Sequence, residues 1–264
     1  MAFCKLIQMD FDQLKEFLDF KAEQYEKKEF LFDDPIQLVH RFQKKEDQEI
    51  IGLLVSTIAW GNRKSIISSG EKLIAIMENA PFEFVMNYKK SNQKLDFVHR
   101  TFNSSDLDFF IRSIQHIYMN FGGLESTFSE NLSISGMKGR IINFRQIFLD
   151  IEHDKRSEKH ISNPLQNSAC KRLNMYLRWM VRPNHKQVDI GIWKSISCSE
   201  LFLPLDVHTS RNARALGLLT RKQDDWKALE ELMQNLRKMD INDPVKYDFA
   251  LFGIGVNEKD LFTN

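Results

Sequence analysis

Two segments of this 264-residue chain carry side chains that could do nucleophilic chemistry. Lys171 stands at the expected start of one helix, and Asp206, shortly after Pro204, stands at the expected start of another. An amine can attack an electrophilic carbon, and a carboxylate fixed by helix capping can take up a proton or stabilise positive charge. Each residue also has a plain structural interpretation, because helix lysines are commonly exposed and aspartate commonly caps helices.

The helix that carries Lys171 is expected to have an apolar face and a cationic face. Its apolar side chains gather on one side of a helical wheel: Leu173, Tyr176, Leu177, Met180 and Val181. The other side would present Lys171, Asn174, Arg178 and Arg182. Residues 164–194 hold six basic residues and one aspartate, a local charge of 6 − 1 = +5 on a protein of net charge +1. Such a face can bind phosphates, although a solvated helical face explains the same charges.

The elements that must position these side chains are nearly all helices. Apolar residues recur at three- and four-residue steps, and glycine (11) and proline (6) are scarce, which predicts an all-α fold. The clearest expected helices cover 11–25, 47–59, 105–121, 169–181 and 226–236. Ser105 with Asp108 predicts a capping box. Asp243-Pro244 predicts a last helix that ends near Gly253 or Gly255.

Composition argues against several classes of protein. No run approaches the roughly 18 apolar residues of a membrane span, and the N-terminus lacks a signal-peptide layout, so we expect a cytoplasmic protein with no membrane partner. Three separated cysteines, Cys4, Cys170 and Cys198, offer neither a disulfide framework nor a Cys-x-x-Cys site. The seven histidines show no metal-ligand spacing. We therefore expect no bound metal and no cofactor.

Two windows of the sequence carry a family resemblance. Ala169-Cys170-Lys171-Arg172-Leu173-Asn174, followed by Leu205-Asp206-Val207-His208, resembles the lysine helix and the aspartate segment of the helix-hairpin-helix (HhH-GPD) DNA glycosylases, nearest the 8-oxoguanine branch. Residues 243–255 resemble their last helix, and the whole chain looks like a member of an uncharacterised bacterial family distantly related to them. The resemblance implies one all-α, two-lobed domain over 1–264 with a central cleft. The polar segment 152–167 marks a soft lobe junction.

The resemblance also implies roles for individual residues. In those glycosylases the matching lysine attacks the sugar C1′ of a flipped, damaged nucleotide, and the matching aspartate assists deprotonation and stabilises charge on the sugar. Lys171 would therefore form a Schiff base, Asp206 would act as acid/base partner, and double-stranded DNA with a damaged or flipped base would be the partner. The expected nucleic-acid contacts are Asn62, Arg63, Arg172, Arg178, Arg182 and Arg211, with Trp60 stacking on a base. The segment Ala59–Arg63 also fits a buried tryptophan, a glycine terminator and a new helix start.

Two departures from the glycosylase pattern leave other functions open. The stretch 163–168 lacks the glycines of the relatives' hairpin, and the spacing of 206 − 171 = 35 positions implies an insertion near 184–200 that could cover the cleft. The alternatives are a non-catalytic nucleic-acid-binding module on the same scaffold and a helical protein-interaction or small-molecule-binding protein. Glycosylase chemistry requires Lys171 and Asp206 to converge on one solvent-reachable concavity.

Overall fold

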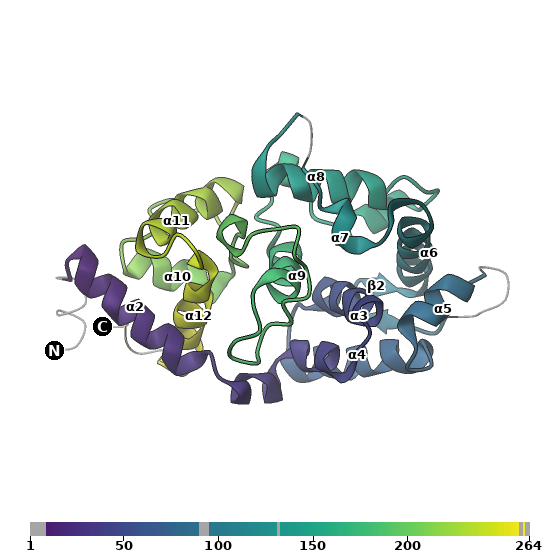
Figure 1. Cartoon of the computed structure of the whole chain (residues 1–264), viewed down its shortest axis with the longest axis horizontal. Helices are drawn as coiled ribbons and strands as arrows, with labels where there is room; N and C mark the ends of the chain where they lie inside the picture. The colour runs from purple at the N-terminus through teal and green to yellow at the C-terminus, as the bar shows by residue number, and fades with distance from the viewer. Residues whose placement is uncertain (1–8, 90–94, 131–132, 259–260, 262–264) are drawn as a thin grey trace.

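The protein is built almost entirely from helices, as the computed structural model shows for residues 9–89, 95–130, 133–258 and 261 (Figure 1). The α-helices are α2 (Phe11–Tyr25), α3 (Lys45–Ile58), α4 (Arg63–Ile76), α5 (Pro81–Asn87), α6 (Ser104–Phe121), α7 (Leu124–Thr127), α8 (Gly136–Phe148), α9 (Lys171–Val181), α10 (Val207–Ala215), α11 (Trp226–Met239) and α12 (Tyr247–Asn257). The 3-10 helices are η1 (Lys28–Asp33), η2 (Pro35–Arg41), η3 (Lys155–His160), η4 (Pro164–Gln166), η5 (Cys198–Glu200) and η6 (Pro244–Lys246). The prediction of an all-α chain is confirmed.

The described residues contain one small sheet. Strands β1 (Val98–His99) and β2 (Phe102–Asn103) pair antiparallel, with Val98 opposite Asn103 and His99 opposite Phe102. The hairpin leads directly into α6.

Two helix ends differ from the sequence-based prediction. The capping box of α6 is formed by Asn103 and Asp106, two residues earlier than the predicted Ser105 and Asp108, because Asn103 already bonds the first free amides. Helix α12 continues past Gly253 and Gly255 to Asn257. These glycines allow close packing instead of ending the helix, since a Cβ at Gly253 would lie 2.2 Å from the Tyr25 ring and one at Gly255 would lie 2.9 Å from His208.

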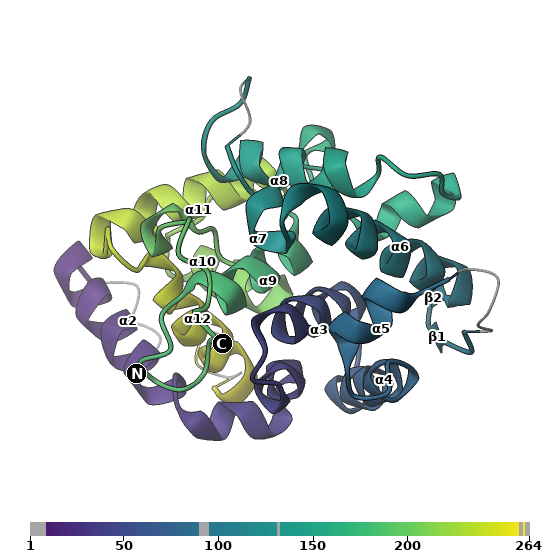
Figure 2. The same ribbon diagram turned by 45° about the vertical axis from the view of Figure 1, so that its right-hand side comes forward.

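The helices gather in two groups with α9 between them (Figures 1 and 2). One group contains α3 to α8, and the other contains α2 together with α10, α11 and α12. Helix α2 packs against α12, which also packs against α10, while α3 packs against α9. The predicted junction at 152–167 holds η3 and η4, where the chain passes from α8 to α9. A single division of the sequence there does not describe the two groups, because α2 lies with the C-terminal helices.

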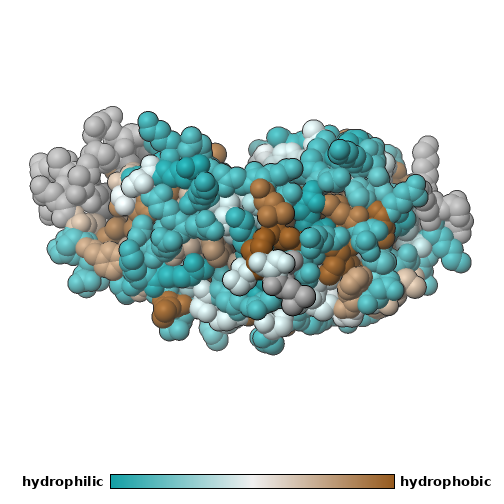
Figure 3. Space-filling view, turned by 90° about the horizontal axis from the view of Figure 1, so that it is seen from above, coloured by the Kyte–Doolittle hydropathy of each residue, from teal (hydrophilic) through white to brown (hydrophobic). Residues whose placement is uncertain are grey.

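The core is aromatic around α3 and α9. Trp179, Tyr176 and Trp193 are fully buried, and Phe128 stacks on Phe144 at a centroid distance of 4.3 Å. The face seen in Figure 3 is mainly hydrophilic, with hydrophobic residues confined to separate patches. Among the described residues, no helix combines the length and apolar character needed to cross a bilayer.

Candidate functional site

Helix α9 presents Lys171 in its first turn because the preceding chain makes a tight turn. Cys170 precedes the helix in the left-handed region at φ 49°, and Asn167 does the same at φ 61°. The turn is therefore formed without the glycines that the glycosylase pattern has there. Asn167 also donates its side-chain N–H to Asp225, and its carbonyl accepts from the Trp226 amide, which fixes the turn against the start of α11.

Asp206 caps α10 and also lies beside Lys171. One carboxylate oxygen accepts the Thr209 backbone N–H at 2.8 Å, and Oδ2 lies 3.4 Å from Lys171 Nζ. Lys171 keeps 41% of its side chain exposed, whereas Asp206 keeps 13%. The capping interpretation and the site interpretation thus hold together: capping holds the carboxylate in place and the amine remains accessible.

Both side chains line one cleft of about 1030 Å³, so Lys171 and Asp206 converge on one concavity, as glycosylase chemistry requires. Its walls come from segments far apart in sequence. Residues from η1 and the start of η2, from the α3–α4 connection, from α9, from the start of α10 and from α12 contribute Asp34, Trp60, Lys171, Asp206 and Phe252, among others. A cleft of this size can enclose a nucleoside-sized ligand.

The segment Ala59–Arg63 forms one wall and satisfies its structural interpretation at the same time. Gly61 adopts φ 100°, a backbone conformation that L side chains rarely adopt, which favours glycine at this turn. Asn62 caps α4 by accepting from the Lys64 amide at 2.9 Å and the Ser65 amide at 3.4 Å. Asn62 lines the cleft, but its amide oxygen is engaged by these bonds.

Trp60 is half-buried at the same wall and belongs to a stack of planar groups. Its ring stacks on His160 at a centroid distance of 6.0 Å, and the Arg172 guanidinium lies 4.8 Å from its centroid. Arg172 also donates to the Thr57 carbonyl, and burial lowers the pKa of Arg172 to about 10. Arg172 is therefore held against the Trp60 ring, and its guanidinium is already committed to protein groups.

Arg63 points into the cleft. Its guanidinium lies over the Phe252 ring at 4.9 Å and over the Phe30 ring at 5.8 Å from the centroids, and it lies 3.9 Å from Asp34. The expected contact with a DNA phosphate would require this side chain to turn outward. Arg211, by contrast, is exposed on α10 and has no hydrogen bond or ion pair within the part of the chain that the structure describes.

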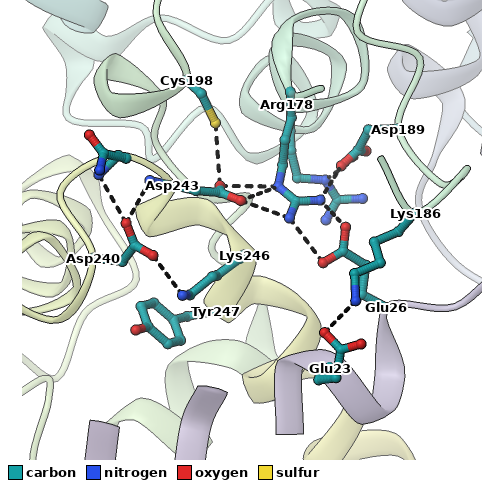
Figure 4. A network of polar contacts seen from close by, with 12 residues as sticks. Glu23, Glu26, Arg178, Lys186, Asp189, Cys198, Asp240, Asp243, Lys246 and Tyr247 are labelled. Atoms are coloured by element: carbon teal, nitrogen blue, oxygen red, sulfur yellow. Dashed lines mark hydrogen bonds and ion pairs between the residues drawn. The ribbon is translucent and has the colours of Figure 1, made fainter. Parts of the chain in front are cut away.

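Arg178 and Arg182 correct the predicted cationic face. They are only 4% and 6% exposed, and Asn174 on the same face is fully buried. Arg178 pairs with Asp189 at 3.2 Å and with Asp248, while Arg182 bonds carboxylates from three segments: Glu26, Asp189 and Asp243. Part of this network is drawn in Figure 4. The helical wheel wrongly predicted an exposed cationic face because α9 is enclosed on this side as well. Neither arginine is therefore free to bind DNA.

The electrostatics of the buried network are coupled to the cleft through Asp248. Burial raises the pKa of Asp248 to about 7; Arg178 lowers it and the nearby Asp206 raises it. For Arg182, burial lowers the pKa, but the hydrogen bonds that it donates to Glu26 and Asp243 hold the pKa well above its usual value. Asp248 also accepts the Thr209 hydroxyl at 3.4 Å, so Thr209 joins Asp206 to Asp248.

The cleft contains five carboxylates and four cations. The carboxylates are Asp33, Asp34, Asp206, Asp224 and Asp248, and the cations are Arg63, Lys64, Lys171 and Arg178. Within the described part of the chain, no three or more acidic, histidine or cysteine side chains converge as metal ligands would. The cleft is therefore a mixed-charge site with aromatic walls, and it differs from a uniformly basic groove.

The insertion near 184–200 does not line the cleft. It packs against α9 and the N-terminal helices instead: the Trp193 indole N–H donates to buried Glu49, and His40 bonds the Val188 carbonyl at 2.7 Å. This segment contributes Asp189 to the arginine network. Its role in the structure is to enclose α9, which is why the cationic face became buried.

Sequence reasoning missed the walls from η1 and α12. Phe30, Asp34, Asp248 and Phe252 gave no periodic or motif signal of a site, since each reads as an ordinary core or capping residue. The one usable signal was the resemblance of 243–255 to the last glycosylase helix, which placed that helix in the fold but named no site residue on it.

The comparisons with known proteins give one match. No curated protein and no solved structure matches the chain. A family model described as "Protein of unknown function (DUF2400)" matches residues 34–257, a span that includes both Lys171 and Asp206 and all of the cleft lining except Phe30 and Asp33 of η1. The chain therefore belongs to the DUF2400 family.

Proposed function

We propose that this protein is a DNA glycosylase of the helix-hairpin-helix type that removes a damaged base through a Schiff base on Lys171. The observation that carries the proposal is the convergence of Lys171 Nζ and Asp206 Oδ2, 3.4 Å apart, on a cleft of about 1030 Å³. As its substrate would be chromosomal DNA, we place the protein in the cytoplasm.

The chemistry assigns one role to each side chain. Lys171 first loses its ammonium proton to solvent; its amine then attacks C1′, the bond from C1′ to the base breaks, and its electron pair leaves with the base. Asp206 takes the proton released by the attacking nitrogen. The sugar ring then opens, its oxygen takes up a proton, and a Schiff base joins Lys171 to C1′. Hydrolysis or strand cleavage would release the enzyme.

The cleft supports the entry of a flipped nucleotide. Trp60 offers a half-buried ring at the wall, held by contacts with His160 and Arg172, as a stacking partner for a base. The exposed cations available for phosphate are fewer than the sequence suggested, because Arg178 and Arg182 are internal. Lys64 and Arg211 remain on the outer surface.

The test is borohydride trapping on a duplex with one abasic site. The native protein should give a covalent product, and Lys171→Gln should give none. Lys227→Gln is the matched control, since Lys227 is an exposed lysine in the first turn of α11 and does not line the cleft. Absence of product from the native protein, with an active glycosylase trapped in parallel, contradicts the proposal.

A non-catalytic nucleic-acid-binding module is the second candidate. One observation separates it from the enzyme: the Asn167, Ser168 and Cys170 amides donate within the turn before α9, so this turn does not hold a DNA phosphate beside Lys171, and DNA would bind through the outer cations alone. This function predicts salt-sensitive DNA binding that is the same in the native protein and in Lys171→Gln, with no trapped product from either.

A further inference from the structure

We infer that the part of the cleft bounded by Phe30, Phe252 and Asp34 is a subsite for a planar cation, and that it takes a damaged base whose ring carries a positive charge. The inference rests on the proposed function for the nature of the ligand. Ring-alkylated purines such as 7-methylguanine are the chemical class.

The structure shows what this subsite accepts, because one of the protein's own side chains occupies it. The Arg63 guanidinium is planar and cationic, and it lies over both phenyl rings with Asp34 at 3.9 Å. Aromatic faces attract cations through the ring quadrupole, and a nearby carboxylate adds Coulomb attraction. A flat, positively charged heterocycle has the same shape and charge as the group it would displace.

Once the Arg63 side chain has left the subsite, the charges that remain around it favour a cationic ligand. Arg178 is neutralised inside the protein by Asp189 and Asp248. The opening of the subsite then carries Asp33 and Asp34. The Asp34 carboxylate is only 13% exposed, and among the described residues its one hydrogen bond comes from the Ile36 amide, at 3.1 Å. A neutral base would leave that carboxylate desolvated without a counter-charge.

The chemistry of the leaving group agrees with this choice. When Lys171 attacks C1′, the electron pair of the broken bond neutralises a cationic base, which leaves without being protonated. A neutral base has to receive a proton as it leaves. The Phe30 and Phe252 rings that bound the subsite carry no proton that could be given to a leaving base, and Asp34 accepts the Ile36 amide with Oδ1. This distinguishes the cleft from one built for 8-oxoguanine, which is neutral.

The test compares two ligands that differ in charge and hardly in shape. A duplex with 7-methylguanine, stabilised by 2′-fluorination so that the base is not lost, is compared with the same duplex carrying neutral 7-methyl-7-deazaguanine. We expect the cationic base to bind about 10-fold more tightly. Equal affinity for the two overturns the inference.

Two variants separate the subsite from general DNA binding. Asp34→Asn keeps the cap on η2 and removes the negative charge. The ratio of the affinities for the cationic and the neutral base should therefore fall close to one. Asp10→Asn makes the same change at the cap of α2, away from the cleft, and should leave the preference unchanged. Thermal unfolding of each variant reports whether it is folded. A preference that survives in Asp34→Asn contradicts the assignment of that carboxylate.

Arg63→Gln gives the opposite expectation and so sharpens the test. If Arg63 occupies the subsite, its removal should strengthen binding of the cationic base several-fold; weaker binding would mean that Arg63 holds the DNA, and it would overturn the inference. Abasic-site trapping, which needs no base, judges the proposed function separately. Trapping without cation preference rejects the subsite alone, and cation preference without trapping rejects the catalytic proposal alone.

Discussion

The two ends of α9 use their cations differently. At the first turn, Lys171 is 41% exposed and faces a cleft, while toward the last turn Arg178 and Arg182 are almost fully buried among carboxylates. Both ends carry ion pairs, but only the first leaves an amine that a ligand can reach. The comparison teaches that the charge of a residue does not identify a site, and that the enclosure of the helix at each end decides which cation can react.

The largest expected effect concerns chemistry at the first turn. Lys171→Gln should reduce trapped product by at least about 100-fold, because among the described residues Lys171 is the amine that pairs with Asp206. The free energy of unfolding should change by less than about 0.5 kcal/mol, since the Lys171–Asp206 pair is partly open to solvent and Gln keeps most of the side-chain stem. Gel analysis of trapped product and urea denaturation measure the two effects. A large loss of stability in Lys171→Gln would show that Lys171 stabilises the fold, as Arg178 and Arg182 at the other end of α9 are expected to do.

The second effect concerns stability at the last turn. Arg182→Met should lower the free energy of unfolding by about 3–5 kcal/mol, because it leaves Glu26, Asp189 and Asp243 without their shared cation. Lys186→Met is the control, since the Lys186–Glu23 pair in Figure 4 is mostly exposed and should contribute at most about 1 kcal/mol. Equal losses in the two variants would show that the buried network is no more stabilising than a surface pair.

The third prediction concerns the pH dependence of stability. It depends on Asp248, which pairs with Arg178 toward one end of α9 and interacts electrostatically with Lys171 at the other. Burial raises the pKa of Asp248 to about 7, whereas an unfolded aspartate has a pKa of about 3.9. Between these values the folded protein holds a proton that the unfolded chain releases. This contribution to the free energy of unfolding therefore falls as pH rises from about 4 to 7, by roughly 1 kcal/mol per unit, and is constant above that range.

Asp248→Asn provides the reference for this measurement. Urea denaturation at a series of pH values should give a difference between native protein and variant that changes through this window. A difference that is the same at pH 4.5 and pH 7.5 would show that Asp248 stays ionised, held by Arg178.

The smallest effect concerns the residue that connects Asp206 to Asp248. Thr209→Val removes the hydroxyl that donates to Asp248 and keeps the amide that donates to Asp206, so we expect a loss of about 1 kcal/mol in stability. Thr220→Val, which removes an exposed hydroxyl bonded to Glu231, should cost less. Thermal melting of both variants checks the order, and a greater cost at Thr220 would reverse it.

Local sequence signals predicted most of the helices. The predicted helix at 11–25 has the observed bounds of α2, and Lys171 and Asp206 lie at helix starts as expected. Capping residues and apolar periodicity act within a few neighbours, so they can be recognised in a sequence. Convergence of Lys171 and Asp206 on one cleft was expected only from the family resemblance, because 35 positions separate them.

Burial of the arginines could not be predicted in the same way. A helical wheel gives the relative directions of Arg178 and Arg182 but does not say which neighbours cover them. The neighbours are Glu26, from the end of α2, and Asp243, from the start of η6, together with the segment that contains Asp189. The same limit applies to the aromatic wall, where Phe30 and Phe252 meet from opposite ends of the sequence.

The packing of α2 on α12 has a consequence for synthesis of the protein. The apolar side of α2 cannot be covered until α12 has emerged from the ribosome, more than 200 residues later. Since α12 also carries Asp248 and Phe252, the cleft is completed only when translation is nearly finished. A nascent chain that stalls before this point exposes the apolar side chains of α2, and it would depend on chaperones to avoid aggregation.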